Sequence, residues 1–359
     1  MLAPIRHLLW AREHLPSATF DLGSSGIPAP PRDTWFDPSR PVTGDVPILA
    51  RRAIADHVGV DARQVHVTFG ATHGYALALA VLTRPGDDVL VEDPTYELMV
   101  RTAEACHVQV RRFVRSSDRG FAIDPAAVAR ALTPKTRAVV VTSLHNPSGN
   151  VTPPDVLREC ARIAERSGAY LVVNELYAPM EDLSDGGTSW HGSARHLGDN
   201  VIAVSSLTKC WGLWAERIGW VAAPSDVIAG VENVIDATIA LAPHAHSLAV
   251  VQAFGNLGRL SERTRGIVRG KRDRVARWVA SQPHLRWTAP TCGLFAFVEH
   301  TRAGDLGTVL GTVLAEDRVA VVPGTFFGIP NGFRLAWGAP DDVVDEGLRR
   351  LAKALPVGA

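Results

Sequence analysis

The chain has 359 residues, of which 46% are hydrophobic and 21% charged, a composition typical of a folded globular protein with a large core. Thirty-seven basic residues balance thirty-seven acidic residues, so the formal net charge is zero. A chain without a basic excess has no overall field to attract nucleic acid or an anionic membrane, and we expect neither as a partner.

The cysteines and the N-terminal residues indicate the cellular compartment in which we expect the protein. The four cysteines lie far apart without a CxxC pair, a pattern that indicates neither a disulfide framework nor a metal site. The N-terminal apolar stretch Leu8–Trp10 is too short for a signal peptide, and no run approaches the length of a membrane span. We therefore expect a cytoplasmic protein that binds no metal.

From about Arg51 to Leu260 the sequence alternates helical patterns with short runs rich in β-branched residues. Such runs, separated by helices, are typical of an α/β fold with a mostly parallel sheet that helices cover on both faces. The predicted strands are Val89–Glu92, Ala138–Thr142, Tyr170–Val173 and Val201–Ser205. One helix has signals at both ends, with Thr152 as its N-cap, Pro153 as its first residue, Asp155 completing a capping box and Gly168 at its end.

The pattern changes beyond residue 260. A basic run over residues 263–277 predicts the solvated face of one long helix. Three further strands and a closing helix then predict a smaller α+β domain, at Leu294–Val298, Val319–Val322, Phe333–Trp337 and Asp342–Leu355. We expect residues 1–44 to pack on this small domain (261–359), and residues 45–260 to form the large domain.

Polar clusters follow several of the predicted strands, and open α/β sheets bind ligands at the carboxyl ends of their strands. Gly70-Ala71-Thr72 opens an apolar helix, where free backbone N–H groups and the helix dipole favour an anion, although many helices begin this way. Lys209 follows a strand beside hydroxyls and tryptophans. Desolvation there would lower the pKa of its amine and favour imine chemistry, whereas a surface lysine near an aromatic patch has the same local sequence.

Three more residues fit the same pattern. Arg217 lies eight residues after Lys209 and is suited to clamp a phosphate. Asn146, in an Asn-Pro-Ser-Gly turn, and Tyr177 each follow a strand and could both donate hydrogen bonds to one aromatic oxygen. Taken singly, these are explained equally well as a turn residue and a part-buried tyrosine, so only their combination indicates a site.

In this order, the segments resemble the class I and II aminotransferases, which are fold-type I enzymes that use pyridoxal 5′-phosphate (PLP). The resemblance runs from about Gly44 to Trp337. It implies the aspartate-aminotransferase fold, a homodimer, and PLP held on Lys209 as a Schiff base.

The resemblance also assigns the other site residues. Gly70, Ala71, Thr72, Ser206 and Arg217 match the phosphate ligands, and Tyr96 matches the aromatic residue that stacks on the pyridine ring. Asn146 and Tyr177 match the two partners of the phenolic oxygen of the cofactor. Arg334 matches the arginine that binds the substrate α-carboxylate.

Two positions depart from the family pattern. Asn174 stands where relatives carry an aspartate that pairs with the pyridine nitrogen, and a neutral amide supplies no charge to keep that nitrogen protonated. Relatives also have a tyrosine shortly before Gly44 that reaches the phosphate of the neighbouring subunit. The stretch Trp35–Pro41 contains none.

The resemblance implies an enzyme that acts at the Cα of an amino acid, with transamination as the commonest reaction and Lys209 as the general acid and base. Because of Asn174, a lyase, such as one that eliminates a β-substituent, or a decarboxylating or oxygen-using enzyme stays open. Detection of a keto acid, rather than ammonia, thiol, CO₂ or peroxide, would separate these. A regulatory module fused to a DNA-binding domain is disfavoured by the absence of a basic excess, and an inactive scaffold by the presence of Lys209, Arg217 and Arg334.

Overall fold

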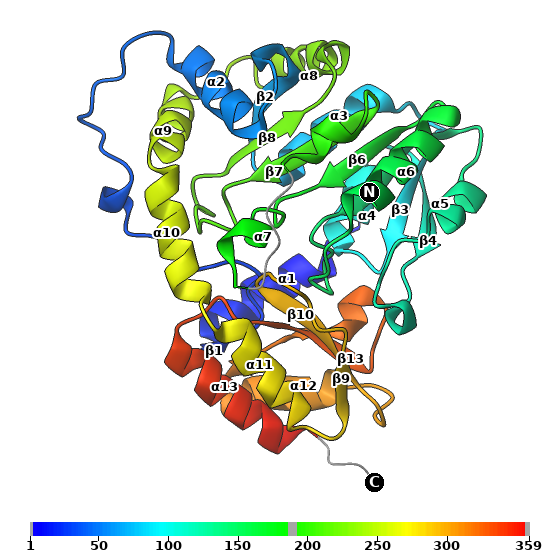
Figure 1. The fold of residues 1–359 in the computed structure, drawn as a ribbon, viewed down its shortest axis with the longest axis vertical. Helices are drawn as coiled ribbons and strands as arrows, with labels where there is room; N and C mark the ends of the chain where they lie inside the picture. Colours follow the sequence, from blue (N-terminus) through cyan, green and yellow to red (C-terminus); the bar gives the residue numbers. More distant parts are fainter. Residues whose placement is uncertain (1–2, 186–191, 356–359) are drawn as a thin grey trace.

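A seven-stranded sheet forms the centre of the larger part of the molecule (Figure 1). In the computed structural model, which describes residues 3–185 and 192–355, the strand order is β2-β8-β7-β6-β5-β3-β4. Of these strands only β8 runs antiparallel to its neighbours, so the predicted mostly parallel sheet is confirmed. The strands are β2 (Val65–Phe69), β3 (Asp88–Asp93), β4 (Gln109–Val114), β5 (Thr136–Thr142), β6 (Tyr170–Asn174), β7 (Val201–Ser206) and β8 (Ile218–Ala222).

The four strands that we predicted in this part all form, each slightly longer than its apolar run. The sequence did not reveal β2, β4 and β8. β4 lies at the edge of the sheet with most side chains exposed, so its residues, including Arg111 and Arg112, have no apolar pattern. β8 is fully buried but contains Gly219, which interrupts a β-branched run.

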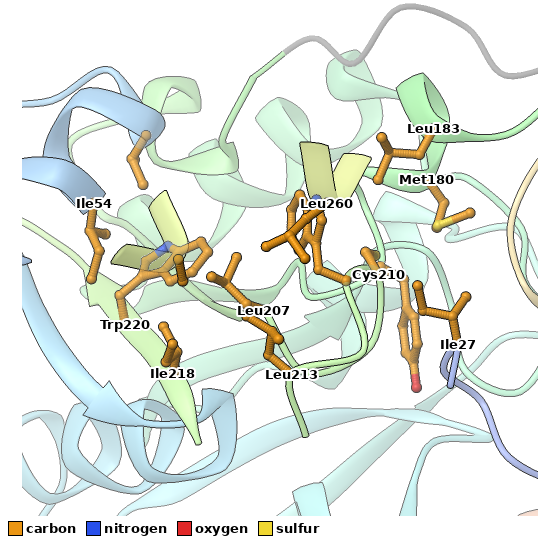
Figure 2. Packing of buried hydrophobic residues seen from close by; sticks show 14 of the residues in the cluster. Ile27, Ile54, Met180, Leu183, Leu207, Cys210, Leu213, Ile218, Trp220 and Leu260 are labelled. Carbon is orange, nitrogen blue, oxygen red and sulfur yellow. The ribbon is translucent and has the colours of Figure 1, made fainter. Parts of the chain in front are cut away.

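Helices cover both faces of this sheet (Figure 1). On one face, apolar side chains of α3 (Ala71–Leu82), α4 (Glu97–Ala105) and α8 (Ser225–Thr238) pack against the strands. The opposite face is covered by two groups of helices, α5 (Pro125–Ala131) with α6 (Pro154–Arg166), and α2 (Val46–Val58) with α9 (His244–Gly255) and α10 (Leu257–Val268). Figure 2 shows Ile54 of α2 and Leu260 of α10 in the same cluster as Trp220 and Leu207.

The start of α6 corrects one prediction. The helix begins at Pro154, and Pro153 precedes it as an N-cap without a side-chain hydrogen bond. Thr152 is buried, and its hydroxyl accepts a hydrogen bond from Arg115 at 3.2 Å. The capping box at Thr152 was therefore wrong, because a tertiary partner takes the hydroxyl that the local pattern assigned to the helix.

The smaller part of the molecule contains an antiparallel sheet of order β12-β13-β10-β9 and three helices. The predicted strand Val319–Val322 is in fact two, because β11 pairs with β1 while β12 joins β13. This parallel β1–β11 pair, Phe20 opposite Val319, brings the N-terminal segment onto the C-terminal part. The elements are β1 (Phe20–Asp21), β9 (Leu285–Trp287), β10 (Phe295–His300), β11 (Val319–Ala320), β12 (Val322–Pro323), β13 (Gly332–Ala336), α11 (Lys271–Ala280), α12 (Gly307–Asp317) and α13 (Asp341–Ala354).

The basic run over residues 263–277 is not one solvated helix. α10 ends at Val268, and Gly270 adopts a left-handed conformation before α11 begins. Lys271 is buried, donates to the carbonyl oxygen of Ala339 and lies 3.3 Å from an Asp341 oxygen. The proposed boundary after residue 260 lies inside α10, and both domain boundaries stay predictions.

The remaining elements are short or lie near the N-terminus. They are α1 (Arg6–His14), α7 (Met180–Leu183) and the 3₁₀ turns Leu15–Ser17, Arg32–Thr34, Ala62–Gln64, Ser117–Arg119, Ala194–Leu197 and Gly324–Phe327. No helix within residues 3–185 and 192–355 is long and apolar enough to cross a membrane.

Gly219 of β8 provides a test of the packing beneath the turn at Gly70. A Cβ at residue 219 would lie 2.5 Å from the Gly70 Cα and carbonyl carbon, so Gly219→Ala forces backbone apart. We expect it to lower the free energy of unfolding by about 2 kcal/mol. Gly266→Ala is the control, because residue 266 lies in α10 with open space around it and should gain about 0.5–1 kcal/mol. Thermal unfolding monitored by circular dichroism measures both, and equal shifts would contradict the packing.

Candidate active site

A cavity of about 530 Å³ lies where the carboxyl ends of the parallel strands meet. Its wall includes Thr142 at the end of β5, Asn174 at the end of β6, and Ser206 at the end of β7. The segments that follow β2 and β3 also reach it, with Thr72 of α3 and Tyr96. Because parallel strands end at the same edge of a sheet, one cavity collects side chains that are far apart in sequence.

Ten of the eleven residues that the sequence assigned to a site line this cavity, and the other, Gly70, lies directly beside it. The structure thus brings the predicted set together, while the role of each residue stays a proposal. The ten are Ala71, Thr72, Tyr96, Asn146, Asn174, Tyr177, Ser206, Lys209, Arg217 and Arg334.

Lys209 lies in the segment after β7, with its amine inside the protein. Burial, together with the nearby cations Arg334 and Arg217, lowers the pKa of this amine to about 8, with Asp21 acting in the opposite direction. The amine makes no hydrogen bond or ion pair with the described residues. At this pKa roughly one-tenth of Lys209 is the neutral, nucleophilic amine at pH 7, a far larger share than in an ordinary lysine.

The turn at Gly70 and the side chain of Arg217 form a corner suited to an anion. Gly70 has φ +84°, and a Cβ at this position would lie 2.5 Å from Arg217 Nη2, so only glycine leaves room for the guanidinium. The first amides of α3 have no acceptor within the helix and carry the positive end of its dipole. Among the described residues, the Arg217 side chain has two long hydrogen bonds, 3.4 Å to the Phe69 carbonyl oxygen and 3.5 Å to that of Trp214.

Arg334 enters the cavity from β13 and connects the two parts of the molecule. Its Nη1 donates to Asn146 Oδ1 and its Nη2 to the Gly23 carbonyl oxygen, both at 2.9 Å. The side chain is buried, and its Nε has no hydrogen-bond partner among the described residues. The guanidinium also lies 5.3 Å from the ring centre of Phe295. A cation held on one side by neutral oxygens and left with a free donor is ready for a carboxylate.

Tyr177 and Asn174 lie side by side in the cavity wall after β6. The Tyr177 hydroxyl donates to Ser25 Oγ at 2.8 Å, and burial raises its pKa. Asn174 is buried, and its amide has only weak partners, Met99 Sδ at 3.6 Å and the Leu176 amide at 3.5 Å. The Asn174 amide is therefore available to a ligand, although it brings no negative charge.

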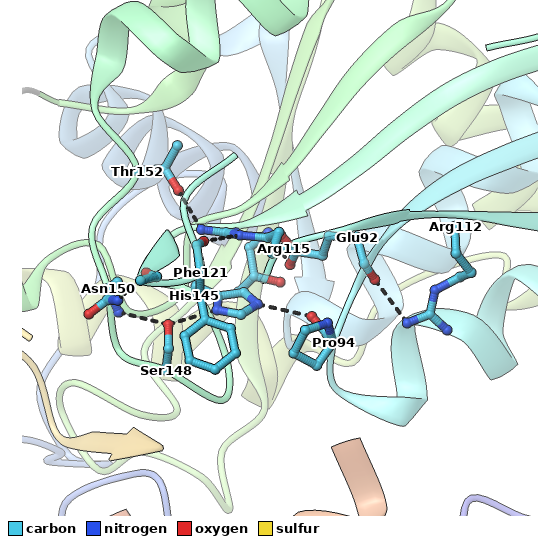
Figure 3. A network of polar contacts seen from close by, with 11 residues as sticks. Glu92, Pro94, Arg112, Arg115, Phe121, His145, Ser148, Asn150 and Thr152 are labelled. Atoms are coloured by element: carbon cyan, nitrogen blue, oxygen red, sulfur yellow. Dashed lines mark hydrogen bonds and ion pairs between the residues drawn. The ribbon is translucent and has the colours of Figure 1, made fainter. Parts of the chain in front are cut away.

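A buried polar network supports the turn that carries Asn146 (Figure 3). Arg115 and Glu92 form an ion pair at 2.6 Å, with both side chains 1% exposed, and the second Glu92 oxygen accepts from the Thr142 amide. Burial raises the pKa of Glu92 and lowers that of Arg115, while their attraction opposes both shifts. Arg115 also donates to the carbonyl oxygen of Phe121.

His145, directly before Asn146, completes this network. Its Nε2 lies 2.9 Å from the Pro94 carbonyl oxygen, which can only accept, so this nitrogen carries the proton. Its Nδ1 then accepts from Ser148 Oγ at 2.7 Å. Burial lowers the pKa of His145 far below its usual value, so the ring stays neutral. One imidazole thus ties the turn that bears Asn146 to the segment that bears Tyr96.

The N-terminal segment contributes residues that the sequence did not assign to the site. His7, Arg12 and other residues of α1 line the cavity, as do Gly23, Ser24 and Ser25. Gly26 packs on the stem of Lys209, since a Cβ there would lie 3.2 Å from Lys209 Cδ. In the sequence, the spacing of these residues along α1 was the available sign of a role in the site. Any amphipathic helix has the same spacing, so this role could not be predicted.

The fold is that of the aspartate aminotransferases, since a solved double mutant of the Thermus thermophilus enzyme superposes with a TM-score of 0.83 at 24% identity, covering 98% of this chain and 94% of that one. The chain belongs to the aminotransferase class I and II family, whose model matches residues 42–351. It is 28% identical to an aspartate aminotransferase of Streptomyces avermitilis, over 82% of this chain and 75% of that protein. It is also 29% identical to capreomycidine synthase of Streptomyces vinaceus, over 96% and 92% of the two chains. The solved structure of the PLP-dependent cyclase OrfR superposes with a TM-score of 0.84 at 28% identity, covering 98% and 96%.

The members of this family depend on PLP. The residues that line the cavity also match the chemical groups of this cofactor. The corner at Gly70 and Arg217 offers donors and positive charge to a phosphate, and Lys209 offers a neutral amine to an aldehyde. Two buried donors, Thr208 Oγ1 and Arg334 Nε, have no partner among the described residues. Buried polar atoms without partners are rare unless a ligand satisfies them.

The Glu92–Arg115 pair predicts a large effect on stability. Arg115→Met should lower the free energy of unfolding by about 3–5 kcal/mol, because it leaves a carboxylate buried without its cation. Adding Glu92→Gln should recover part of this loss. Arg112→Met is the matched control, since its 2.6 Å pair with Asp93 is partly exposed and should contribute within about 1 kcal/mol. Urea unfolding followed by tryptophan fluorescence measures all four proteins, and similar midpoints for the two arginine variants would refute this prediction.

Proposed function

We propose that this chain binds PLP on Lys209 and acts at the Cα of an amino acid, as an aminotransferase. The observation that carries the proposal is the buried Lys209 amine, with its pKa lowered to about 8, in the cavity where the other predicted site residues meet. PLP, when bound, withdraws electrons from an attached amino acid and weakens the bonds at its Cα. The side chains of this protein supply the rest of the catalysis.

Lys209 is the proposed acid and base. A neutral amine can take the proton from Cα, and its conjugate acid can return it to another atom. The pKa of about 8 is close to the operating pH, where an amine can do both. The neighbouring cations favour the neutral form, so the base is ready without a carboxylate to activate it.

Arg334 is the proposed binding residue for the substrate α-carboxylate. Its Nε is free, and a carboxylate can displace the neutral Asn146 oxygen from Nη1 because a charge-assisted pair is stronger. That exchange would free Asn146 Oδ1 and let the side chain turn, so that its NH2 group, the proposed donor to the phenolic oxygen of PLP, could change direction. Binding of the substrate and the placing of Asn146 are thereby linked through one hydrogen bond.

The proposed phosphate ligands surround the corner described above. They are the first amides of α3 from Ala71, the hydroxyls of Thr72 and Ser206, and the Arg217 guanidinium, with Gly70 giving the space. Tyr96 is proposed to stack on the pyridine ring, and Tyr177 to share the phenolic oxygen with Asn146. Asn174 is proposed to lie near the pyridine nitrogen, where its amide supplies a hydrogen bond without charge.

We also propose a homodimer in the cytoplasm. The side chains of Trp214 and Leu241 are 59% and 77% exposed, and Trp214 bonds Arg217 through its carbonyl oxygen. Large exposed apolar side chains, of which Trp214 lies beside the cavity residue Arg217, favour an interface with a second copy. The four cysteines are free thiols, as is usual in a reducing compartment. Light scattering of the PLP-loaded protein measures the assembly.

A second reaction class has specific support. Asn174 provides no carboxylate, and two relatives carry the names of a synthase and a cyclase rather than of an aminotransferase. In this alternative the enzyme breaks a bond of the substrate side chain without moving the amino group to an acceptor. Mass spectrometry of the products after incubation with amino acids and a keto acid acceptor distinguishes the two. A new keto acid with equimolar aminated acceptor supports transamination.

The role of Lys209 predicts a pH dependence. Labelling of the apoprotein with PLP and borohydride should modify Lys209, at a rate that rises with pH and levels off above about pH 8, where the amine is neutral. Solvated lysines in general titrate near pH 10, so their labelling should still be rising there. Peptide mapping at each pH gives both rates. Preferential labelling of any other lysine would contradict the proposed attachment.

The role of Asn174 predicts a gain by substitution. Asn174→Asp introduces a carboxylate that favours a protonated pyridine nitrogen, so exchange of the Cα proton for deuterium should become about tenfold faster or more. Proton NMR of the substrate amino acid in D₂O measures exchange in both proteins. Asn233→Asp, at an exposed position of α8, controls for the added charge. Equal exchange in wild type and Asn174→Asp would mean that Asn174 has no electronic role.

A further inference from the structure

A short N-terminal segment, residues 23–26, lies against the proposed site residues. The carbonyl oxygen of Gly23 accepts a hydrogen bond from Arg334 Nη2 at 2.9 Å. Two residues further on, Ser25 Oγ accepts a hydrogen bond from the Tyr177 hydroxyl at 2.8 Å. The segment therefore meets the site in two places, and at Ser25 it does so with a polar side chain.

Backbone hydrogen bonds hold this segment at both ends. Before it, the Leu22 amide donates to the Ala320 carbonyl oxygen at 2.9 Å, and the Leu22 carbonyl oxygen accepts from the Ala336 amide of β13 at 2.8 Å. After it, the Ile27 amide donates to the carbonyl oxygen of Lys209 at 3.1 Å. A side chain between two such anchors has a defined position relative to the reactive amine, as a catalytic site requires.

The Ser25 hydroxyl has one hydrogen-bonding function left. A serine oxygen accepts hydrogen bonds and also donates its own proton. Ser25 is 6% exposed, accepts from Tyr177, and forms no other hydrogen bond with residues 3–185 and 192–355. The neighbouring Ser24 differs, because its hydroxyl donates to Asp21. The proton of Ser25 is therefore available, and Ser25 is one of the residues that line the cavity.

Tyr177 has one proton and, in the proposed function, a second acceptor for it. Burial raises the pKa of Tyr177, so its phenol stays protonated at any working pH. A negatively charged phenolic oxygen on PLP is a stronger acceptor than the neutral hydroxyl of Ser25. The Tyr177 proton turns to that oxygen when PLP is bound. Ser25 can then rotate its own proton toward the Tyr177 oxygen, because a hydroxyl is free to turn.

We propose that Ser25 is a positioning residue that donates to Tyr177 while Tyr177 donates to the phenolic oxygen of PLP. The inference rests on the proposed function, because it takes Tyr177 as a partner of that oxygen. Both hydrogen bonds point the same way, and bonds in such a chain polarise and strengthen one another. The N-terminal segment thus adjusts the charge of the cofactor through Tyr177, without contacting the phenolic oxygen itself.

The Schiff base of PLP with Lys209 provides the measurement, because its protonation changes the absorbance of the cofactor. Loss of its proton leaves the phenolic oxygen negative with no neighbouring proton, so donors to that oxygen lower the pKa of the Schiff base. Ser25→Ala should raise this pKa by about 0.2–0.6 pH unit, the share that cooperativity adds to one bond. Tyr177→Phe should raise it by about one to two pH units, because it removes the donor. Absorbance titration of the PLP-loaded protein without substrate measures both.

A double variant separates this chain of bonds from an independent role of Ser25. In the Tyr177→Phe protein, adding Ser25→Ala should leave the pKa of the Schiff base unchanged, because no phenol remains to transmit the effect. Ser25→Cys fills the space with a weak donor, and it should raise the pKa as Ser25→Ala does.

Ser261→Ala is the matched control. Ser261 Oγ also accepts from an aromatic side chain, Trp211 Nε1 at 3.0 Å, but it lies outside the cavity lining. This variant should keep the wild-type pKa of the Schiff base. Thermal unfolding of each protein shows that the compared variants are folded.

The outcomes keep the two proposals apart. An unchanged pKa in Ser25→Ala, or an equal rise with and without the Tyr177 phenol, would overturn the role of Ser25 while Lys209 still holds PLP. A lower pKa in Ser25→Ala would also overturn it, because Ser25 would then compete for the Tyr177 proton. If borohydride reduction found no PLP on Lys209, the proposed function would fail and the role of Ser25 with it.

Discussion

The structure depends on holding one amine inside the cavity, next to two other cations that lower its pKa. Lys209 is enclosed at the carboxyl edge of the sheet, with Arg217 and Arg334 nearby and no carboxylate among the cavity-lining residues. A cluster of positive charges inside a protein is unfavourable unless anions compensate it. This repulsion lowers the stability of the empty site, and on the proposed function phosphate and carboxylate groups would balance its charge. The same electrostatic repulsion among the cations increases the affinity of the site for anions.

The surroundings hold this unfavourable cluster in place. The ends of the strands form one side of the cavity. Because Gly219 has no Cβ, β8 can lie in direct backbone contact with the turn at Gly70. On the other side, Arg115, Glu92 and His145 fix the turn of Asn146 through buried bonds. Arg334 then reaches across from the small sheet to that turn, so the two parts of the molecule meet at the cavity.

The sequence patterns predicted correctly the features that depend on local residue types, such as an apolar strand with a polar residue at its end. β5, β6 and β7 are buried apolar runs, and the residues that follow them, Asn146, Asn174 and Lys209, were correctly expected to meet at one place. The patterns were insufficient where a tertiary contact decides the outcome. Thr152 gives its hydroxyl to Arg115 instead of capping α6, and α1 carries cavity residues that look like any amphipathic helix. The division of Val319–Val322 between two sheets likewise depends on partners from elsewhere in the chain.

The pairing of β1 with β11 has a consequence for how the protein is made. Phe20 leaves the ribosome about 300 residues before Val319, its partner in the ladder, so the N-terminal segment must wait through most of translation. Until then Phe20 and Asp21 lack their strand partners, and Phe326, whose ring stacks on His7 of α1, has not yet been made. The large sheet can form earlier, because its strands are made in one continuous stretch. A nascent chain would thus acquire its scaffold first and its complete ligand cavity only near the end of synthesis.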